Sequence, residues 1–195
     1  MIKSVKQKLS FGLGASMLAL GLIVGLASPV PAAPEKTVTV GGAPMYPSKN
    51  IVQNAVNSKD HTTLVAAVKA AGLVETLSGP GPFTVFAPTN AAFAKLPAGT
   101  VETLLKPENK GKLTQVLTYH VVPVKALSDA IAKMIKDDGG MHAIKTVSGG
   151  KLWASMKNGN VFLKDEKGRM AKVTIANVVQ SNGVIHVIDT VLLPN

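Results

Sequence analysis

Closely spaced turn signals in the last third of the chain are the feature that most restricts its fold. Asn158-Gly159, Lys167-Gly168 and Ser181-Asn182-Gly183 each separate short runs rich in β-branched and aromatic residues. Asn-Gly is the strongest short-range signal for a two-residue β-hairpin. The pattern predicts antiparallel strands over 144–147, 151–156, 161–164, 173–179, 184–189 and 191–193.

Helical spacing dominates the residues before this region. Leu64, Ala67, Val68 and Ala71 fall on one helix face, and Gly72 is well placed to end that helix. The same reasoning predicts helices near 51–56, 90–93, 100–105, 107–117 and 128–136. Short apolar runs at 83–87 and 119–122 interrupt them as buried strands. Helices followed by antiparallel hairpins indicate a single unit with an α+β fold.

The first 33 residues have the order of a secretory signal. Three lysines precede an apolar run over 9–27, and Pro29 and Pro31 precede a cut site after Ala32 or Ala33. The alternative is an uncleaved anchor, because a membrane span needs about 20 apolar residues. No basic stop-transfer cluster follows, however. We expect a signal peptide over 1–33, a Pro/Gly-rich linker over 34–48 and one domain over 49–195. The exported protein is expected to be secreted or periplasmic, with no stable membrane span after cleavage.

Charge and cysteine content narrow the function classes. The chain has no cysteine, which excludes thiol catalysis, iron–sulfur clusters and a lipid anchor on cysteine. Three lysines and no acid lie in the signal, so the net charge of +10 becomes +7 after cleavage. Such a balance suits an acidic polysaccharide or protein surface, although scattered lysines also serve solubility. No basic stripe with stacking aromatics is evident, so nucleic-acid binding is not expected.

Three ordered motifs give the chain a specific resemblance. Residues 81–93 read GPFTVFAPTNAAF, residues 181–189 read SNGVIHVID, and Tyr119-His120 lies between them. In this order they resemble the fasciclin (FAS1) domain over roughly 49–195. The resemblance implies a wedge of two antiparallel-rich β-sheets with a helical layer. It also implies a non-enzymatic adhesion module, here of a bacterial secreted type.

The resemblance implies where a partner binds as well. The Tyr-His region of the family is implicated in adhesion, and some animal members bind integrins through an acidic segment just before the second motif. That segment carries Asn177 in place of the acid here, so integrin binding by this route is not expected. The candidate partner-binding residues are Tyr119, His120, Asn177, Val178 and Val179. Packing is the competing interpretation, because the core is the usual place for apolar residues of these motifs.

Enzyme signatures are absent from the sequence. It contains no Gly-x-Ser-x-Gly elbow, no Gly-x-Gly-x-x-Gly and no phosphate loop. The acid pairs Asp137-Asp138 and Asp165-Glu166 lie at predicted turns beside lysines, which indicates solvated turns rather than facing catalytic carboxylates. We therefore expect no catalysis.

The histidines do not predict a metal site. His61, His120, His142 and His186 form no close sequence pair, and a metal would need two or three of them to converge with acids. Hydrogen-bonded structural histidines are the favoured interpretation. We expect no metal and no cofactor.

Two functions remain. The first is an adhesion or matrix-interaction module that binds a cell-surface protein or an acidic envelope polysaccharide. The alternative is binding of an apolar small molecule such as a carotenoid, because some relatives with this fold bind pigments. Met134, Met141, Met156 and Met170 are suited to line an adaptable groove, although filling gaps in the core is the commoner use of methionine.

Overall fold

The computed structural model describes residues 35–195, so the signal peptide predicted for 1–33 lies outside the described residues. The helices are α1 (Ile51–Ala55), α2 (Thr62–Ala71), α3 (Val74–Ser78), α4 (Asn90–Ala94), α5 (Thr100–Leu105), α6 (Lys110–Tyr119) and α7 (Ser128–Asp137), with 3-10 turns η1 (Lys59–His61) and η2 (Pro107–Asn109). The strands are β1 (Val38–Val40), β2 (Ala43–Met45), β3 (Phe83–Pro88), β4 (Val121–Val122), β5 (Met141–Lys145), β6 (Lys151–Lys157), β7 (Asn160–Lys164), β8 (Met170–Gln180) and β9 (Gly183–Ile188).

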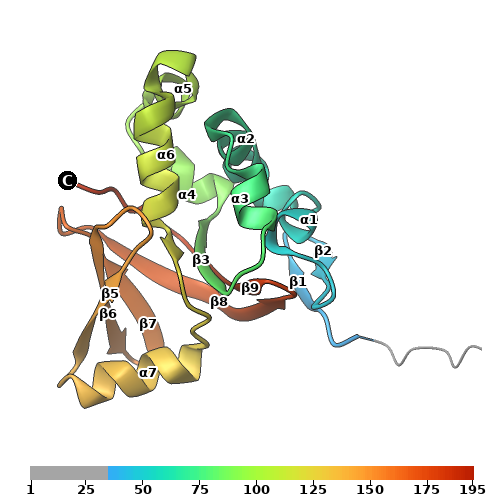
Figure 1. Cartoon of the computed structure of the whole chain (residues 1–195). Helices are drawn as coiled ribbons and strands as arrows, with labels where there is room; N and C mark the ends of the chain where they lie inside the picture. Colours follow the sequence, from blue (N-terminus) through green and yellow to red (C-terminus); the bar gives the residue numbers. More distant parts are fainter. Residues whose placement is uncertain (1–34) are drawn as a thin grey trace, which may run out of the picture. The chain divides into compact units, whose positions relative to one another are not determined.

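Seven strands form a continuous ladder in the order β4-β3-β9-β8-β7-β6-β5. The long strand β8 belongs to two sheets, because its first residues pair with β7 and the remainder pairs with β9. Register shifts between Val173 and Val178 bend β8 where the partners change. The sheets diverge from this strand (Figure 1). Strands β3 and β9 run parallel, and the other pairs are antiparallel. The predicted α+β fold with antiparallel-rich sheets is confirmed.

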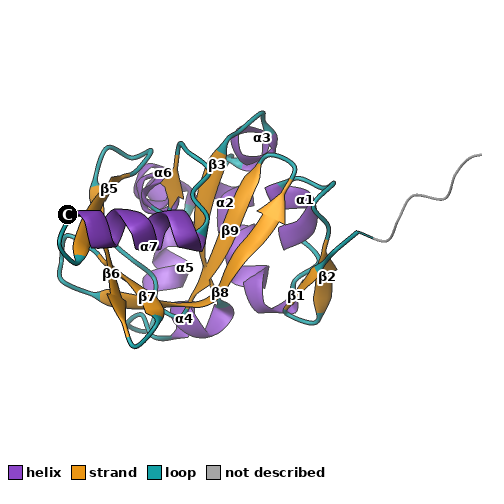
Figure 2. Ribbon diagram, turned by 90° about the horizontal axis from the view of Figure 1, so that it is seen from below, coloured by secondary structure: helices purple, strands orange, loops and turns teal. Residues whose placement is uncertain are grey.

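Two hydrophobic cores lie on opposite sides of β3 and β9. Helices α1–α6 cover one side, and α7 lies on the other side, in front of the strands in Figure 2. Alternate residues divide between the cores: Val85 and Ile185 enter the helical core, whereas Phe86 and Ile188 enter the core under α7. All six residues of β9 are buried. The period-two alternation of this strand therefore sorts side chains between two buried layers.

The segment predicted as a linker contains folded structure. Strands β1 and β2 pair antiparallel, and Val40 and Met45 are buried at 4% and 3% exposure. Gly41 and Gly42, with φ of 58° and 77°, form the two-residue turn between the strands. Glycine and proline in this segment thus mark a hairpin, and the folded unit begins before Lys49.

Two hairpin glycines have different physical roles. Asn158 and Gly159 have φ of 51° and 74°, which confirms the predicted turn between β6 and β7. The Asn182-Gly183 pair is a similar turn signal, but Gly183 does not adopt a positive φ. A Cβ on Gly183 would lie 2.2 Å from the carbonyl oxygen of Phe83. Glycine is required there because the backbone of β3 approaches too closely for a side chain.

Candidate partner-binding site

Tyr119 closes helix α6 rather than opening a strand, and its side chain is fully buried. Its hydroxyl donates to the carbonyl oxygen of Lys151 at 2.6 Å and accepts from the backbone N–H of Glu166 at 3.2 Å. Burial raises the pKa of Tyr119 to about 12. Both hydrogen-bonding capacities of the hydroxyl are used inside the domain, so Tyr119 is not a surface contact.

His120 is also internal, with 3% exposure. Its Nδ1 contacts the carbonyl oxygen of Val116 at 2.8 Å, and Nε2 accepts from the backbone N–H of Leu192 at 3.1 Å. These partners assign the proton to Nδ1 and a neutral ring. Burial lowers the pKa of His120 to about 4. The ring joins the end of α6 to the C-terminal segment.

Two acidic residues, Asp165 and Glu166, complete the connection between His120 and the C-terminal segment. Asp165 Oδ2 accepts from the backbone N–H of Leu193 at 3.0 Å, and Glu166 Oε2 accepts from that of Asn195 at 3.2 Å. The strand predicted over 191–193 does not form, because side chains rather than a neighbouring strand take its N–H groups. The solvated turn predicted for Asp165 is also wrong, since Asp165 is 1% exposed and accepts from two further backbone amides.

Asn177 has a structural task as well. Its φ of 59° is in the left-handed region, which asparagine tolerates better than most residues. Its Oδ1 accepts from the backbone N–H of Ser128 at 2.7 Å, and its Nδ2 donates to Ser128 Oγ at 2.7 Å. Asn177 therefore caps α7 from β8, and no side chain of the N-cap residue itself makes a capping hydrogen bond.

His186 fixes the loop that leads into α7. Its Nε2 contacts the carbonyl oxygen of Ala126 at 2.9 Å, and Nδ1 accepts from the backbone N–H of Asn177 at 3.3 Å. Burial lowers the pKa of His186, and the ring stacks on Phe86 with centroids 5.7 Å apart. Thr84 Oγ1 holds the same loop by donating to Val124 and accepting from Ala126.

A hollow between β8 and the β1–β2 hairpin is where the candidate set reaches the surface. It has a volume of about 360 Å³, and it is lined by Lys36, Val38, Met45, Pro47, Asn177 and Val179. Asn177 and Val179 are half-buried, whereas Val178 points inward with 1% exposure. The structure thus places Tyr119, His120 and Val178 inside the fold and brings Asn177 and Val179 to this hollow, which we call the β8 hollow. The hairpin side of the hollow is not evident from the sequence, because the glycine and proline content of 34–48 is typical of a linker.

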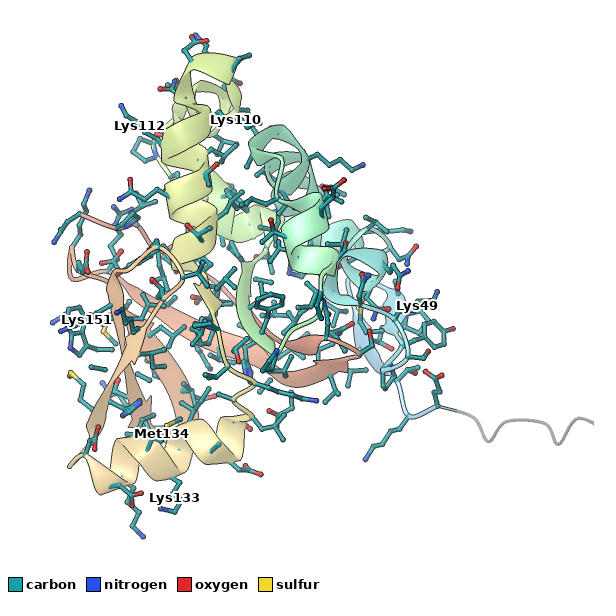
Figure 3. The ribbon with its side chains drawn as sticks, in the orientation of Figure 1. Lys49, Lys110, Lys112, Lys133, Met134 and Lys151 are labelled. Carbon is teal, nitrogen blue, oxygen red and sulfur yellow. The ribbon has the colours of Figure 1, made fainter. Side chains whose placement is uncertain are left out.

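A second cavity of about 270 Å³ lies beside α7. Phe86, Val122, Ile131, Met134 and Ile144 form much of its apolar wall, and His142 also lines it. Met134 projects from α7 toward the strands (Figure 3). The prediction that four methionines line a groove is wrong for three of them: Met141, Met156 and Met170 are 50%, 44% and 49% exposed.

The histidines do not gather around a common point. His142 contacts Asp138 at 2.7 Å on the surface, and His61 lies in the helical layer with Nδ1 on Ser58 Oγ at 2.8 Å. Within residues 35–195, no group of three His, Asp or Glu side chains is arranged to hold a metal ion. Over the same residues, no helix combines the length and apolar character needed to cross a membrane.

Comparisons with known proteins agree with this architecture. A Fasciclin domain family model matches residues 59–194. Protein sll1483 of Synechocystis sp. is 49% identical over 160 residues, which are 82% of this chain and 82% of that protein. Transforming growth factor-beta-induced protein ig-h3 of Sus scrofa is 40% identical over 131 residues, which are 67% of this chain and 17% of that protein.

A solved structure shares the fold. A FAS1 domain pair from the insect cell adhesion molecule Fasciclin I superposes with a TM-score of 0.67 at 16% identity, over 82% of this chain and 58% of that chain. The match of the family model to 59–194, together with the sequence relatives, shows that this chain belongs to the fasciclin domain family.

Proposed function

We propose that the protein is a secreted or periplasmic, non-enzymatic module that binds a cell-surface or extracellular partner through the β8 hollow. The observation that carries this proposal is the division of the candidate residues. Tyr119 and His120 use their polar atoms internally, whereas Asn177 and Val179 line an open hollow. Contact with a partner therefore falls to the hollow and not to the Tyr-His motif.

The chemistry of the β8 hollow suits a protein partner. Val38, Pro47 and Val179 offer apolar surface, and the Lys36 side chain is exposed at the same site. An apolar floor with a charged rim is the usual composition of a protein interface. Lys36 supplies an attraction for an acidic partner that salt would screen within about 8–10 Å.

Capture of partners from a cell-envelope fraction by the exported protein tests this proposal. Val179→Arg fills the hollow with a long side chain, and Lys36→Glu reverses the charge at its rim. We expect each variant to lose most of the captured partner while keeping the wild-type melting temperature. Lys106→Glu, at an exposed position on α5's C-terminal side, is the matched control and should capture normally. Normal capture by folded Val179→Arg and Lys36→Glu would refute the assignment of the hollow.

The proposed location has its own test. N-terminal sequencing of the protein recovered outside the cytoplasm should begin after Ala32 or Ala33, as the signal order predicts. Recovery of the protein from the cytoplasm with Met1 intact would contradict export.

Binding of an apolar small molecule is a second candidate, favoured by the cavity beside α7. Its volume of about 270 Å³ lies near the lower end of ligand pockets, which hold about 300–1,000 Å³. It suits a small apolar group, or one end of a long polyene. Reconstitution with a carotenoid should give a visible absorption band that Met134→Trp abolishes and the exposed Met156→Trp preserves. A protein that takes up no pigment would exclude this candidate.

A further inference from the structure

The outer face of strands β5–β8 carries an ordered set of aromatic and basic side chains. The inner face is closed, because Leu152, Ala154, Leu163 and Ala171 have 0% exposure. Residues that alternate with these point the other way. They include six that we call the aromatic–lysine face: Lys145, Lys151, Trp153, Phe162, Lys164 and Lys172.

Strand register brings these six side chains together. Trp153 lies directly across from Lys164, Phe162 across from Lys172, and Lys145 across from Lys151. Directly paired residues have Cβ atoms about 4.5–5.5 Å apart. Each aromatic ring thus has a lysine as its cross-strand neighbour, and the array continues over four strands about 4.8 Å apart.

The charges on this face are uncompensated by ion pairs. Among the described residues, none of the four lysines has a carboxylate oxygen within ion-pair distance. Glu166 and Asp189 lie at the margins, where their carboxylates accept from the backbone N–H groups of Lys151 and Lys172. Like charges directly opposite, such as Lys145 and Lys151, destabilise a sheet. A bound polyanion would relieve this repulsion.

We propose that the aromatic–lysine face binds a linear acidic polysaccharide. The apolar faces of sugar rings pack on Trp153 and Phe162, and the carboxylate or sulfate groups pair with the surrounding lysines. An anionic membrane fits less well, because membrane-surface binding buries an apolar face about 5–10 Å deep, whereas both aromatic side chains are already half-buried. The inference rests on the proposed extracytoplasmic role, since single-stranded nucleic acid uses similar side chains.

The chain offers a direct probe, because Trp153 is its only tryptophan. Alginate, a polyuronate, is titrated into the exported protein while tryptophan fluorescence is recorded. We expect a saturable change that neutral dextran does not produce and that weakens as sodium chloride is added. Lys151→Gln with Lys164→Gln should weaken binding about tenfold, from a few-fold for each exposed ion contact.

Lys110→Gln with Lys112→Gln is the matched control, since it removes the same charge from α6, away from Lys151 (Figure 3). This pair should bind alginate within about twofold of the wild type. If both double variants lost the same alginate affinity, net charge alone would explain the binding, and the assignment of the site to the aromatic–lysine face would be refuted. Tighter binding of a single-stranded oligonucleotide or of phosphatidylglycerol vesicles than of alginate would overturn the polysaccharide assignment. Failure with alginate alongside intact partner capture that depends on Val179 would reject this inference and leave the proposed function standing.

Discussion

Removing the Tyr119 hydroxyl measures the structural contribution of the Tyr-His motif. Tyr119→Phe keeps the buried ring and deprives the Lys151 carbonyl and the Glu166 N–H of their shared partner. Leaving a buried polar group unsatisfied costs about 1–3 kcal/mol. We expect the free energy of unfolding to fall by about 2–3 kcal/mol, because two such groups are affected and partial relaxation recovers some of the loss. For a domain of this size the melting temperature should fall by about 4–12 °C.

Urea unfolding followed by Trp153 fluorescence is the assay. Tyr46→Phe is the matched control, because the Tyr46 hydroxyl has no hydrogen bond among the described residues and its ring is half-buried. We expect the control to stay within about 0.5 kcal/mol of the wild type. A Tyr119→Phe protein that unfolds at the wild-type urea concentration, with an unchanged slope, would refute the structural assignment of this hydroxyl.

Three further perturbations test other parts of the scaffold. Gly183→Ala should prevent folding or lower the free energy of unfolding by more than about 3 kcal/mol, because the new Cβ would meet the Phe83 carbonyl. Gly111→Ala in α6 should instead stabilise the protein by about 0.5–1 kcal/mol. Thermal melts compare the two variants, and only a small loss of stability in Gly183→Ala would contradict the close approach of the two backbones. Burial lowers the pKa of His120 from 6.5 to about 4, so the unfolded chain binds the proton more readily than the folded protein. The free energy of unfolding should therefore keep the full contribution of the neutral ring above pH 6.5 and decline as the pH falls toward 4. Urea unfolding midpoints at pH 7.5, 6 and 5 measure this decline. A flat profile over that range would count against the buried neutral ring. Asn177→Ala removes the cap of α7 and places alanine at a positive φ. Loss of the cap costs about 1–2 kcal/mol of helix stability, and the backbone strain adds to this, so amide exchange in α7 should accelerate by about 10- to 100-fold while exchange in α2 does not change. Equal acceleration in both helices would show that the effect is global.

The alternation of apolar residues predicted much of the fold. Val85 and Phe86 are adjacent in the sequence and enter different cores, as the period of a strand requires. The Asn158-Gly159 turn was also predictable from the sequence, because few residue pairs adopt two successive positive φ angles. Local chemistry dictates these features, so local sequence reveals them.

Features that depend on residues distant in the sequence could not be predicted from local sequence. The 191–193 segment has strand composition, but His120 and Asp165 capture its amides across the fold. The position of Asp165 near lysines is typical of a solvated turn. Only the folded structure shows that its carboxylate is surrounded by backbone N–H groups, such as that of Arg169. The sequence motif of a residue does not state whether its side chain faces inward or outward.

Of the five candidate partner-binding residues, Asn177 and Val179 line the β8 hollow, and their contact with a partner stays a prediction. The hairpin wall opposite them is not evident from the sequence, because its glycine and proline content is typical of a linker. The aromatic–lysine face left a trace in the alternation of Lys151 and Trp153. Its extent becomes visible when strand register places Lys164 across from Trp153.

We propose that the surface of the β8 hollow binds the partner while the Tyr-His motif supports the fold. Parallel capture from the envelope fraction by wild type, Val179→Arg and Tyr119→Phe, at a temperature where all three are folded, tests it directly. We expect Val179→Arg to lose the partner and Tyr119→Phe to retain it. Loss of the partner by folded Tyr119→Phe, with normal capture by Val179→Arg, would show that the Tyr-His motif, and not the β8 hollow, carries partner binding.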